Sequence, residues 1–425
     1  MSGQALVSPA AMLFLLAACG PAMQSPSHAT RNSAVPSAAT RTSAAAPAMP
    51  LHTEGRFIVD AAGRRVRLLA VSWYGAESED FAVGGLHVQP LDTIAGLIAR
   101  LGFNTVRLPW SNEMVERDPV VPDRALTANP GLRGRHALEV FDSVVAALTR
   151  RGVMVVLDNH NSDAEWCCGR DGNELWYNDR YPESSWIADW RAMAARYRDE
   201  PLVVGADLRN EPRGSATWGG PPASDWHAAA ERGGNAILDV NPDLLIIVEG
   251  TGWAADLAGV DTLPVVVDLP RRVVYEAHDY AWFESHGSYE EWVANITPKW
   301  GYLVTGTRPQ PLWMGEFGTC YTRPDCIRSD DPEAYGSWYG HLTRYIASHD
   351  LDWAYWAVNG TQTTGAGRTF GAVEGYGVLN ATWSGISDAA HMDALRRIMG
   401  GRRPPRYSMR SASTGSTAEA RRAGT

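Results

Sequence analysis

Two segments in which an apolar run ends in a glutamate hold the side chains best suited to chemistry. They are residues 207–212 (Asp-Leu-Arg-Asn-Glu-Pro) and residues 312–318 (Leu-Trp-Met-Gly-Glu-Phe-Gly). An unpaired carboxylate inside a buried strand costs several kcal/mol, but one at the C-terminal end of a parallel strand opens onto the face where barrel enzymes build their sites. Two such glutamates, Glu211 and Glu316, provide the acid and the nucleophile or base that hydrolysis of a glycosidic bond needs.

The residues beside each glutamate favour a functional role over the alternative, an ordinary ion pair at a strand end. Asn210 precedes the first glutamate, and Pro212 ends its strand because proline cannot donate to a sheet ladder. Gly315 and Gly318 lie on either side of the second glutamate and let the backbone approach closely. We therefore predict that both carboxylates belong to a catalytic site.

The composition narrows the class of protein. The chain has 425 residues, of which 45% are hydrophobic, and this is enough for one large core. Its net charge of −10 argues against a nucleic-acid-binding surface. The single lysine, Lys299, lies in a Pro/Trp segment away from any strand end, which disfavours Schiff-base chemistry. The 17 tryptophans offer flat rings that pack on the C–H faces of sugars, as expected of a glycan enzyme.

The N-terminal segment has the features of an export signal. Residues 10–18 form an apolar run that is too short to span a bilayer. Residues 16–20 (Leu-Ala-Ala-Cys-Gly) resemble the bacterial lipoprotein motif, with Cys19 as the lipidated residue, and the alternative is a plain secretory signal with an incidental cysteine. We expect an exported protein, extracellular or in the cell envelope, that meets a membrane only through this anchor.

Composition also predicts the domain organisation. We assign residues 1–19 to a lipoprotein-type signal peptide, 20–50 to a disordered Ala/Pro/Ser/Thr tether, 51–400 to a catalytic domain and 401–425 to a disordered basic tail. Since the export signal implies an oxidising compartment, Cys320 and Cys326 are predicted to form a disulfide. The adjacent Cys167 and Cys168 remain open between a vicinal disulfide and a zinc site, and the absence of a nearby histidine or further cysteine at ligand spacing disfavours zinc.

Short apolar runs alternate with amphipathic stretches along the chain. The predicted strands are residues 68–72, 103–108, 153–157, 203–208, 244–248, 273–277, 312–316 and 353–358, and the clearest helical patterns are 137–150, 185–197 and 389–399. Eight such units predict a single α/β domain with the (β/α)8 fold of the TIM barrel. A doubly wound sheet is the alternative, but residues 72–75 (Ser-Trp-Tyr-Gly) lack the glycine-rich phosphate turn expected after its first strand.

Polar or aromatic residues follow most of the predicted strands. In chain order these are Arg107, residues 158–160 (Asp-Asn-His), Asn210 with Glu211, residues 278–280 (His-Asp-Tyr), Glu316 and Trp356. Any one of them could be a satisfied structural residue. Because unrelated structural residues have no reason to share one rim of a barrel, their convergence predicts an active site.

These residues resemble the motif set of glycoside hydrolase family 5, the cellulase-like clan of retaining (β/α)8 enzymes, over about residues 52–400. The matching positions are Arg107, His160, Asn210, Glu211, His278, Tyr280, Glu316 and Trp356. Residues 186–190 and 226–232 look most like bacterial endo-β-1,4-glucanases, whereas 166–173 and 376–380 look more like plant and bacterial members whose substrates are less certain. The resemblance implies a secreted hydrolase that cleaves β-1,4-glucan with retention and needs neither metal nor other cofactor.

The resemblance also implies a role for each residue. Glu316 is the expected nucleophile and Glu211 the acid/base, whose pKa the charge of Glu316 should raise. The other residues are expected to support this pair: Arg107 and Tyr280 orient Glu316, Asn210 binds the sugar 2-OH, His160 and His278 position the two carboxylates, and Trp356 forms the floor of the subsite.

Other functions stay open at this point. A different β-glycan is possible as substrate: mannan, xyloglucan, a β-glucoside or a glycolipid. A non-catalytic glycan-binding barrel would keep the tryptophans but lose a carboxylate, and both are present. The single lysine and the lack of clusters of metal-ligand residues weigh against a lysine- or metal-dependent lyase. A serine hydrolase is disfavoured because the sequence contains no Gly-x-Ser-x-Gly motif. We expect a monomer that binds a polysaccharide or oligosaccharide and no nucleic acid.

Overall fold

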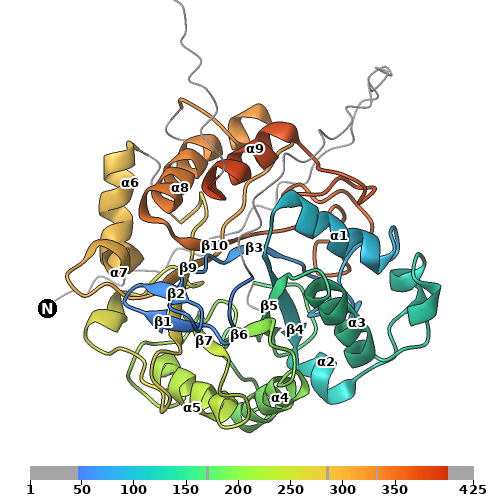
Figure 1. Cartoon of the computed structure of the whole chain (residues 1–425), viewed down its shortest axis with the longest axis horizontal. Helices are drawn as coiled ribbons and strands as arrows, with labels where there is room; N and C mark the ends of the chain where they lie inside the picture. The colour runs from blue at the N-terminus through green and yellow to red at the C-terminus, as the bar shows by residue number, and fades with distance from the viewer. Residues whose placement is uncertain (1–45, 169–171, 284–286, 332–333, 401–425) are drawn as a thin grey trace, which may run out of the picture. The chain divides into compact units, whose positions relative to one another are not determined.

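Eight parallel strands form a closed barrel at the centre of the protein (Figure 1). This computed structural model describes residues 46–168, 172–283, 287–331 and 334–400. The barrel order is β10-β3-β4-β5-β6-β7-β8-β9, with bounds β3 Leu69–Ser72, β4 Thr105–Ser111, β5 Met154–Asn161, β6 Val203–Asp207, β7 Leu245–Glu249, β8 Val273–His278, β9 Leu312–Glu316 and β10 Asp352–Tyr355. The predicted (β/α)8 barrel is confirmed, and the doubly wound sheet is excluded because the ring of strands closes.

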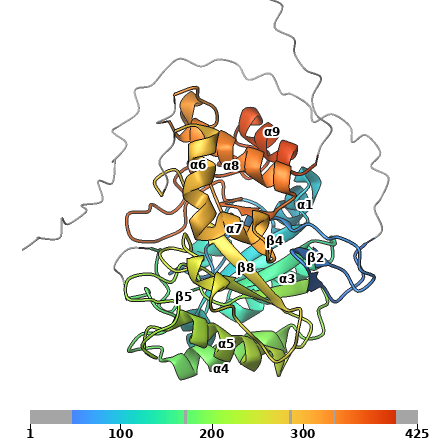
Figure 2. The same cartoon turned by 90° about the vertical axis from the view of Figure 1, so that its left-hand side faces the viewer.

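Helices surround the barrel, as Figures 1 and 2 show. Their bounds are α1 Leu91–Leu101, α2 Asn112–Arg117, α3 Ala137–Thr149, α4 Glu183–Arg196, α5 Trp226–Leu238, α6 Tyr289–Ile296, α7 Tyr302–Thr305, α8 Tyr335–His349 and α9 Ala389–Ile398, with short helical turns η1 Asp123–Leu126, η2 Pro130–Leu132, η3 Ala258–Asp261, η4 Thr297–Gly301 and η5 Pro324–Cys326. In α3, the buried residues Val140, Phe141, Val144 and Leu148 recur with the helical period. In the described part of the chain, no helix is both long and apolar enough to cross a membrane.

A small antiparallel hairpin, which the sequence did not predict, packs against the N-terminal ends of the barrel strands. It consists of β1 (His52–Glu54) and β2 (Phe57–Val59). Ile58 joins a buried apolar cluster with inward-facing strand residues such as Met154 and Val204. Residues 46–50, the last part of the predicted tether, belong to the same folded unit, since the amide of Ala48 donates to the Asp60 carboxylate at 3.1 Å.

Close packing between α4 and α5 supports the chain just before Glu211. Trp186 and Trp190 of α4 are fully buried, and both indole N–H groups donate to the carbonyl oxygen of Leu208, at 3.1 and 3.0 Å. Gly233 of α5 lies directly against the Trp186 ring, so that a Cβ at this position would come within 2.3 Å of it. The two helices thus fix the exit of β6 through a contact that only glycine permits.

A pair of glycine-to-alanine variants tests this contact. We expect Gly233→Ala to lower the free energy of unfolding by about 1–3 kcal/mol, because the new methyl group overpacks against Trp186. Gly340→Ala is the matched control: Gly340 lies in α8, and a Cβ there would meet no neighbouring atom within 4 Å, so alanine should raise stability by about 0.5–1 kcal/mol. Urea unfolding measures both changes, and a Gly233→Ala protein as stable as wild type would contradict the proposed packing constraint.

Candidate active site

The two glutamates meet at the C-terminal ends of the barrel strands. Glu316 is the last residue of β9, and Glu211 lies four residues beyond the end of β6. A carboxylate oxygen of each lies within 4.8 Å of the other and of a ring nitrogen of His278. This separation suits direct attack by one carboxylate on a sugar, since carboxyl groups that must admit a water between them and the sugar stand about 6.5–9.5 Å apart.

Glu316 is held by two donors. The Arg107 guanidinium donates to its Oε1 at 2.7 Å, and the Tyr280 hydroxyl donates to its Oε2 at 3.0 Å. Burial, together with the charge of Glu316, raises the pKa of Tyr280 well above its usual value, so this hydroxyl stays a donor. A carboxylate that accepts a hydrogen bond on each oxygen is fixed in orientation, as a nucleophile must be.

Glu211 has a contrasting environment. It is 7% exposed, and burial raises its pKa to about 7, although Arg213, His160 and Arg107 oppose this rise. The charge of Glu316, which we expected to raise this pKa, is not among its main causes. Because its site is poorly solvated, Glu211 keeps its proton at pH values below about 7, and this is the form that a general acid needs.

Arg107 also contacts other carboxylates besides that of Glu316. Its guanidinium also lies 2.8 Å from Asp207, 3.1 Å from Asp158 and 3.0 Å from Glu249, and it donates to the Asn210 side-chain oxygen at 3.0 Å. Glu249 in turn accepts the backbone N–H of Glu211 at 2.6 Å. The arginine and its partners thus join both catalytic candidates in one buried network.

The sequence reasoning missed Asp207, Glu249 and Glu276 as members of this network. Asp207 and Glu249 end apolar strands just as Glu316 does, and Glu276 interrupts an apolar strand. The signal that identified Glu316, a carboxylate at the end of an apolar run, is present at the first two positions.

Aromatic rings form the neighbouring part of the site. Trp356, which follows β10, is half-buried and stacks with His160 at 5.4 Å and with Tyr74 at 5.2 Å between ring centroids. The imidazole of His160 is fixed by Asp158, 2.7 Å from its Nδ1. Burial lowers the pKa of His160 to about 3, so the ring is neutral. These contacts set the orientation of the indole beside the catalytic pair.

Both cysteine pairs have geometry that bears on the sequence predictions. The Cα atoms of Cys320 and Cys326 are 5.4 Å apart, a separation that a disulfide spans. The bond itself stays a prediction, which mass spectrometry of unreduced peptides would test. The Asn210 side-chain amide lies 3.4 Å from Cys167 Sγ and 3.6 Å from Cys168 Sγ, and Cys167 Sγ is 4.0 Å from a Glu211 oxygen. The adjacent pair, left open by the sequence, thus borders the candidate acid.

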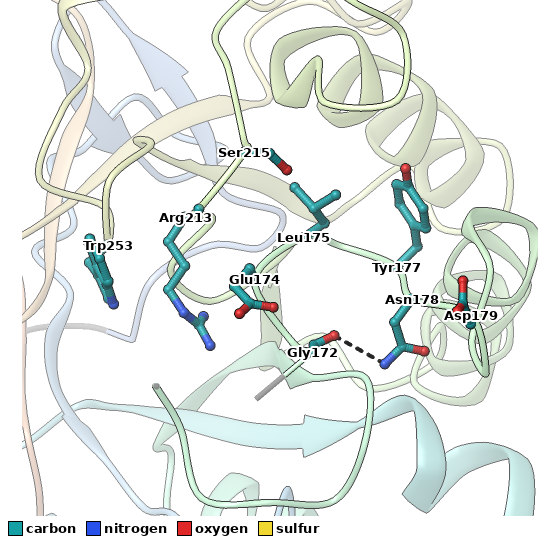
Figure 3. A pocket seen from close by; sticks show the side chains of 10 residues that line it. Gly172, Glu174, Leu175, Tyr177, Asn178, Asp179, Arg213, Ser215 and Trp253 are labelled. Atoms are coloured by element: carbon teal, nitrogen blue, oxygen red, sulfur yellow. Dashed lines mark hydrogen bonds between the residues drawn. The ribbon is translucent and has the colours of Figure 1, made fainter. Parts of the chain in front are cut away.

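A cavity of about 840 Å³ is lined by residues that include Arg213, two positions after Glu211 (Figure 3). Arg213 and Trp253 line one end, and Tyr177 and Asn178 line the other. The Trp253 indole donates to the carbonyl oxygen of Cys168 at 3.3 Å, which links this cavity to the cysteine pair beside Glu211. The cavity therefore lies next to the chain that follows the candidate acid.

Three groups of side chains in the described residues bring ligand atoms close enough to hold a cation. They are Glu211, His278 and Glu316, then Glu249, Glu276 and His278, and finally Cys167, Cys168 and Glu211. In the first two groups, hydrogen bonds already occupy both nitrogens of His278, at 3.0 Å to Glu211 and 3.1 Å to Glu276. The arrangement can accordingly work as a hydrogen-bonded acid–base system.

The sequence is similar to those of known glycoside hydrolases. The family model described as cellulase (glycosyl hydrolase family 5) matches residues 59–362. An endoglucanase of Paenibacillus polymyxa is 36% identical over 328 residues, which cover 72% of this chain and 79% of that protein. The major extracellular endoglucanase of Xanthomonas campestris is 31% identical, over 81% of this chain and 70% of that protein.

Solved structures extend the similarity to three dimensions. The catalytic domain of the Xanthomonas campestris enzyme superposes with a TM-score of 0.70 at 31% identity, covering 82% of this chain and 99% of that chain. A cellotetraose complex of an endocellulase from Pyrococcus horikoshii gives a TM-score of 0.70 at 27% identity, over 83% of this chain and 99% of that one. With its closed barrel, its paired carboxylates and these matches, the chain belongs to glycosyl hydrolase family 5, the cellulase family.

Proposed function

We propose that this enzyme is an endo-β-1,4-glucanase that hydrolyses glucan with retention of the β-anomer. The observation that carries the proposal is the pair of carboxylates within 4.8 Å of each other in opposite environments. Glu316 has Arg107 and Tyr280 as donors, whereas burial favours a proton on Glu211. One carboxyl group is thus suited to attack, and the other to protonate a leaving group.

The reaction proceeds by double displacement. Glu316 attacks the anomeric carbon while Glu211 gives its proton to the glycosidic oxygen, and the bond to the leaving sugar breaks. Glu211, now ionised, then takes a proton from a water molecule that attacks the glycosyl-enzyme ester and restores Glu316. Asn210, held by Arg107 at 3.0 Å, is the candidate to bind the sugar 2-OH.

Cleavage within a chain requires room for sugars on both sides of the catalytic pair. Trp356, stacked on His160, offers one ring, and Trp253, which is 36% exposed, lines the cavity next to Arg213. Aromatic rings of this kind suit a linear glucan, whose sugars present apolar faces. The cellotetraose complex of the Pyrococcus horikoshii enzyme supports an oligoglucan as ligand.

Export and membrane anchoring through Cys19 are also proposed. The extracellular relative from Xanthomonas campestris supports export. Residues 1–45, which include Cys19, lie outside the described part of the chain.

Neutralising each carboxylate should have distinct kinetic effects. We expect Glu316→Gln to abolish turnover of every substrate, because the nucleophile is lost. Glu211→Gln should lower kcat/KM for cellotetraose by about 10²–10⁴-fold but that for a dinitrophenyl β-cellobioside by less than about tenfold, since this leaving group needs no proton. Equal losses on the two substrates would contradict the role of Glu211.

The pH dependence of kcat/KM tests the role of Glu211 in a second way. The pKa of Glu211 is raised to about 7, so the acid form is populated below that pH and lost above it. We expect kcat/KM for cellotetraose to fall as the pH rises through about 7, with no such fall in the first step with the dinitrophenyl substrate. A cellotetraose profile that stays flat from pH 5 to about 9 would contradict this acid.

Substrate and stereochemistry are tested together. Proton NMR of a cellotetraose digest should show the β-anomer of the product before mutarotation, and the viscosity of a soluble β-1,4-glucan should fall early relative to the release of reducing ends. An initial α-anomer would overturn the double displacement. Activity confined to mannan, or to single terminal sugars, would overturn the substrate but leave the catalytic pair intact.

The lipid anchor predicts a change in location for a single variant. We expect Cys19→Ala to move the protein from the membrane fraction to the soluble fraction of the cell envelope or medium, because the acceptor of the lipid is lost. Fractionation followed by immunoblotting measures the distribution, with Cys320→Ala as the cysteine control. Equal membrane retention of Cys19→Ala and wild type would contradict the anchor.

A further inference from the structure

A buried glutamate that the mechanism does not yet use lies behind the candidate acid. Glu276, in β8, is fully buried, and its Oε1 lies 3.1 Å from Nε2 of His278. On the other side of the same imidazole, Nδ1 lies 3.0 Å from Oε1 of Glu211. A line of hydrogen bonds therefore runs from Glu276 through His278 to the acid/base.

The surroundings of Glu276 favour its neutral form. The neighbouring strands point four carboxyl groups and one guanidinium toward it: Arg107 of β4, Asp158 of β5, Asp207 of β6, Glu249 of β7 and Glu316 of β9. The guanidinium of Arg107, which these groups share, stands 3.6 Å from Glu276 Oε1. No N–H or hydroxyl donor among the described residues bonds to Glu276 Oε2, and the Asp207 carboxyl group lies within hydrogen-bonding reach of Glu276. Burial and the Asp207 charge raise the pKa of Glu276 well above its usual value, because a charged oxygen without such a donor costs more than a carbonyl oxygen.

The absence of a side chain at Gly315 leaves space for the carboxyl group of Glu276. A Cβ at Gly315 would stand 1.5 Å from Glu276 Oε1. Any side chain at this position would therefore displace the carboxyl group from His278. The glycine that precedes the nucleophile, which the sequence marked as a close approach of the backbone, admits Glu276.

The imidazole of His278 can carry its single N–H proton on either Nδ1 or Nε2. Burial lowers its pKa to about 3, so the ring is neutral and one nitrogen carries N–H while the other accepts. When a neutral Glu276 donates its O–H to Nε2, the ring proton is left on Nδ1. The N–H at Nδ1 then donates to Glu211 Oε1.

We propose that Glu276 is a positioning residue that donates a proton to Nε2 of His278 and so fixes the Nδ1–H tautomer, which keeps the acid proton of Glu211 on Oε2. This inference rests on the proposed function of Glu211. In bond cleavage the Oε2 proton passes to the glycosidic oxygen, and the Nδ1–H bond to Oε1 remains and stabilises the new carboxylate. In the opposite tautomer, Glu211 would donate its proton from Oε1 to Nδ1, away from the substrate.

Nitrogen NMR of protein labelled with ¹⁵N-histidine tests the tautomer without any assay of activity. The signals of His278 are assigned by comparison with His278→Gln. We expect the shifts of an Nδ1–H ring in wild type and in Glu276→Gln, because the amide also donates to Nε2. Glu276→Met removes the donor and should give Nε2–H or a mixture. An Nε2–H ring in wild type would overturn the proposal.

Kinetics supply the second test. We expect Glu276→Met to lower kcat/KM for cellotetraose by about 10²-fold and that for a dinitrophenyl β-cellobioside by less than about threefold, with Glu276→Gln close to wild type on both. Asp352→Asn is the control, since Asp352 is a buried carboxyl group of β10 that bonds to Arg65 and to the Leu68 amide, away from Glu276 and His278, and it should affect both substrates by the same factor. If Glu276→Gln loses as much as Glu276→Met, an ionised carboxylate is required and the proposal is wrong. Should wild type fail on every glucan while His278 is Nδ1–H, the substrate assignment fails and the tautomer stands.

Discussion

The contact of one buried guanidinium with several carboxylates is the interaction on which the site depends. Arg107 is fully buried and bonds to Asp207, Glu249 and Glu316 from three different strands. Buried charges are tolerated only when they are paired, and removal of one partner costs about 3–5 kcal/mol. Arg107 thus holds Glu316 in place and at the same time satisfies the carboxylates that support Glu211.

The imbalance of charge in this network has a chemical consequence. A single guanidinium cannot neutralise all the carboxyl groups around it, so some of them keep their protons. Burial raises the pKa of Asp158 and Asp207 to about 7, although Arg107 opposes the rise. Glu316 has Arg107 and Tyr280 as donors on its two oxygens, whereas burial raises the pKa of Glu211 and favours its protonated form. The proposed division into nucleophile and acid rests on this unequal hydrogen bonding and solvation.

The barrel positions this network through contacts remote from the chemistry. The indoles of Trp186 and Trp190 bond to the carbonyl oxygen of Leu208, and the backbone N–H of Glu211 bonds to Glu249. Glu211 has a positive φ of 51°, a conformation that is costly for this residue type and persists only when the surroundings impose it. Helix packing and strand-end carboxylates together impose it here.

The sequence by itself determined the barrel and singled out the candidate catalytic pair, because both arise from local patterns. Each apolar run formed a barrel strand within a few residues of its predicted bounds, and Glu211 and Glu316 were marked by the ends of such runs. Only the tertiary structure decided which buried acids join Arg107, that Cys167 borders Glu211, and that burial rather than Glu316 sets the Glu211 pKa. Those features depend on inward-facing side chains from strands far apart in sequence, whose contacts and solvation no local pattern specifies.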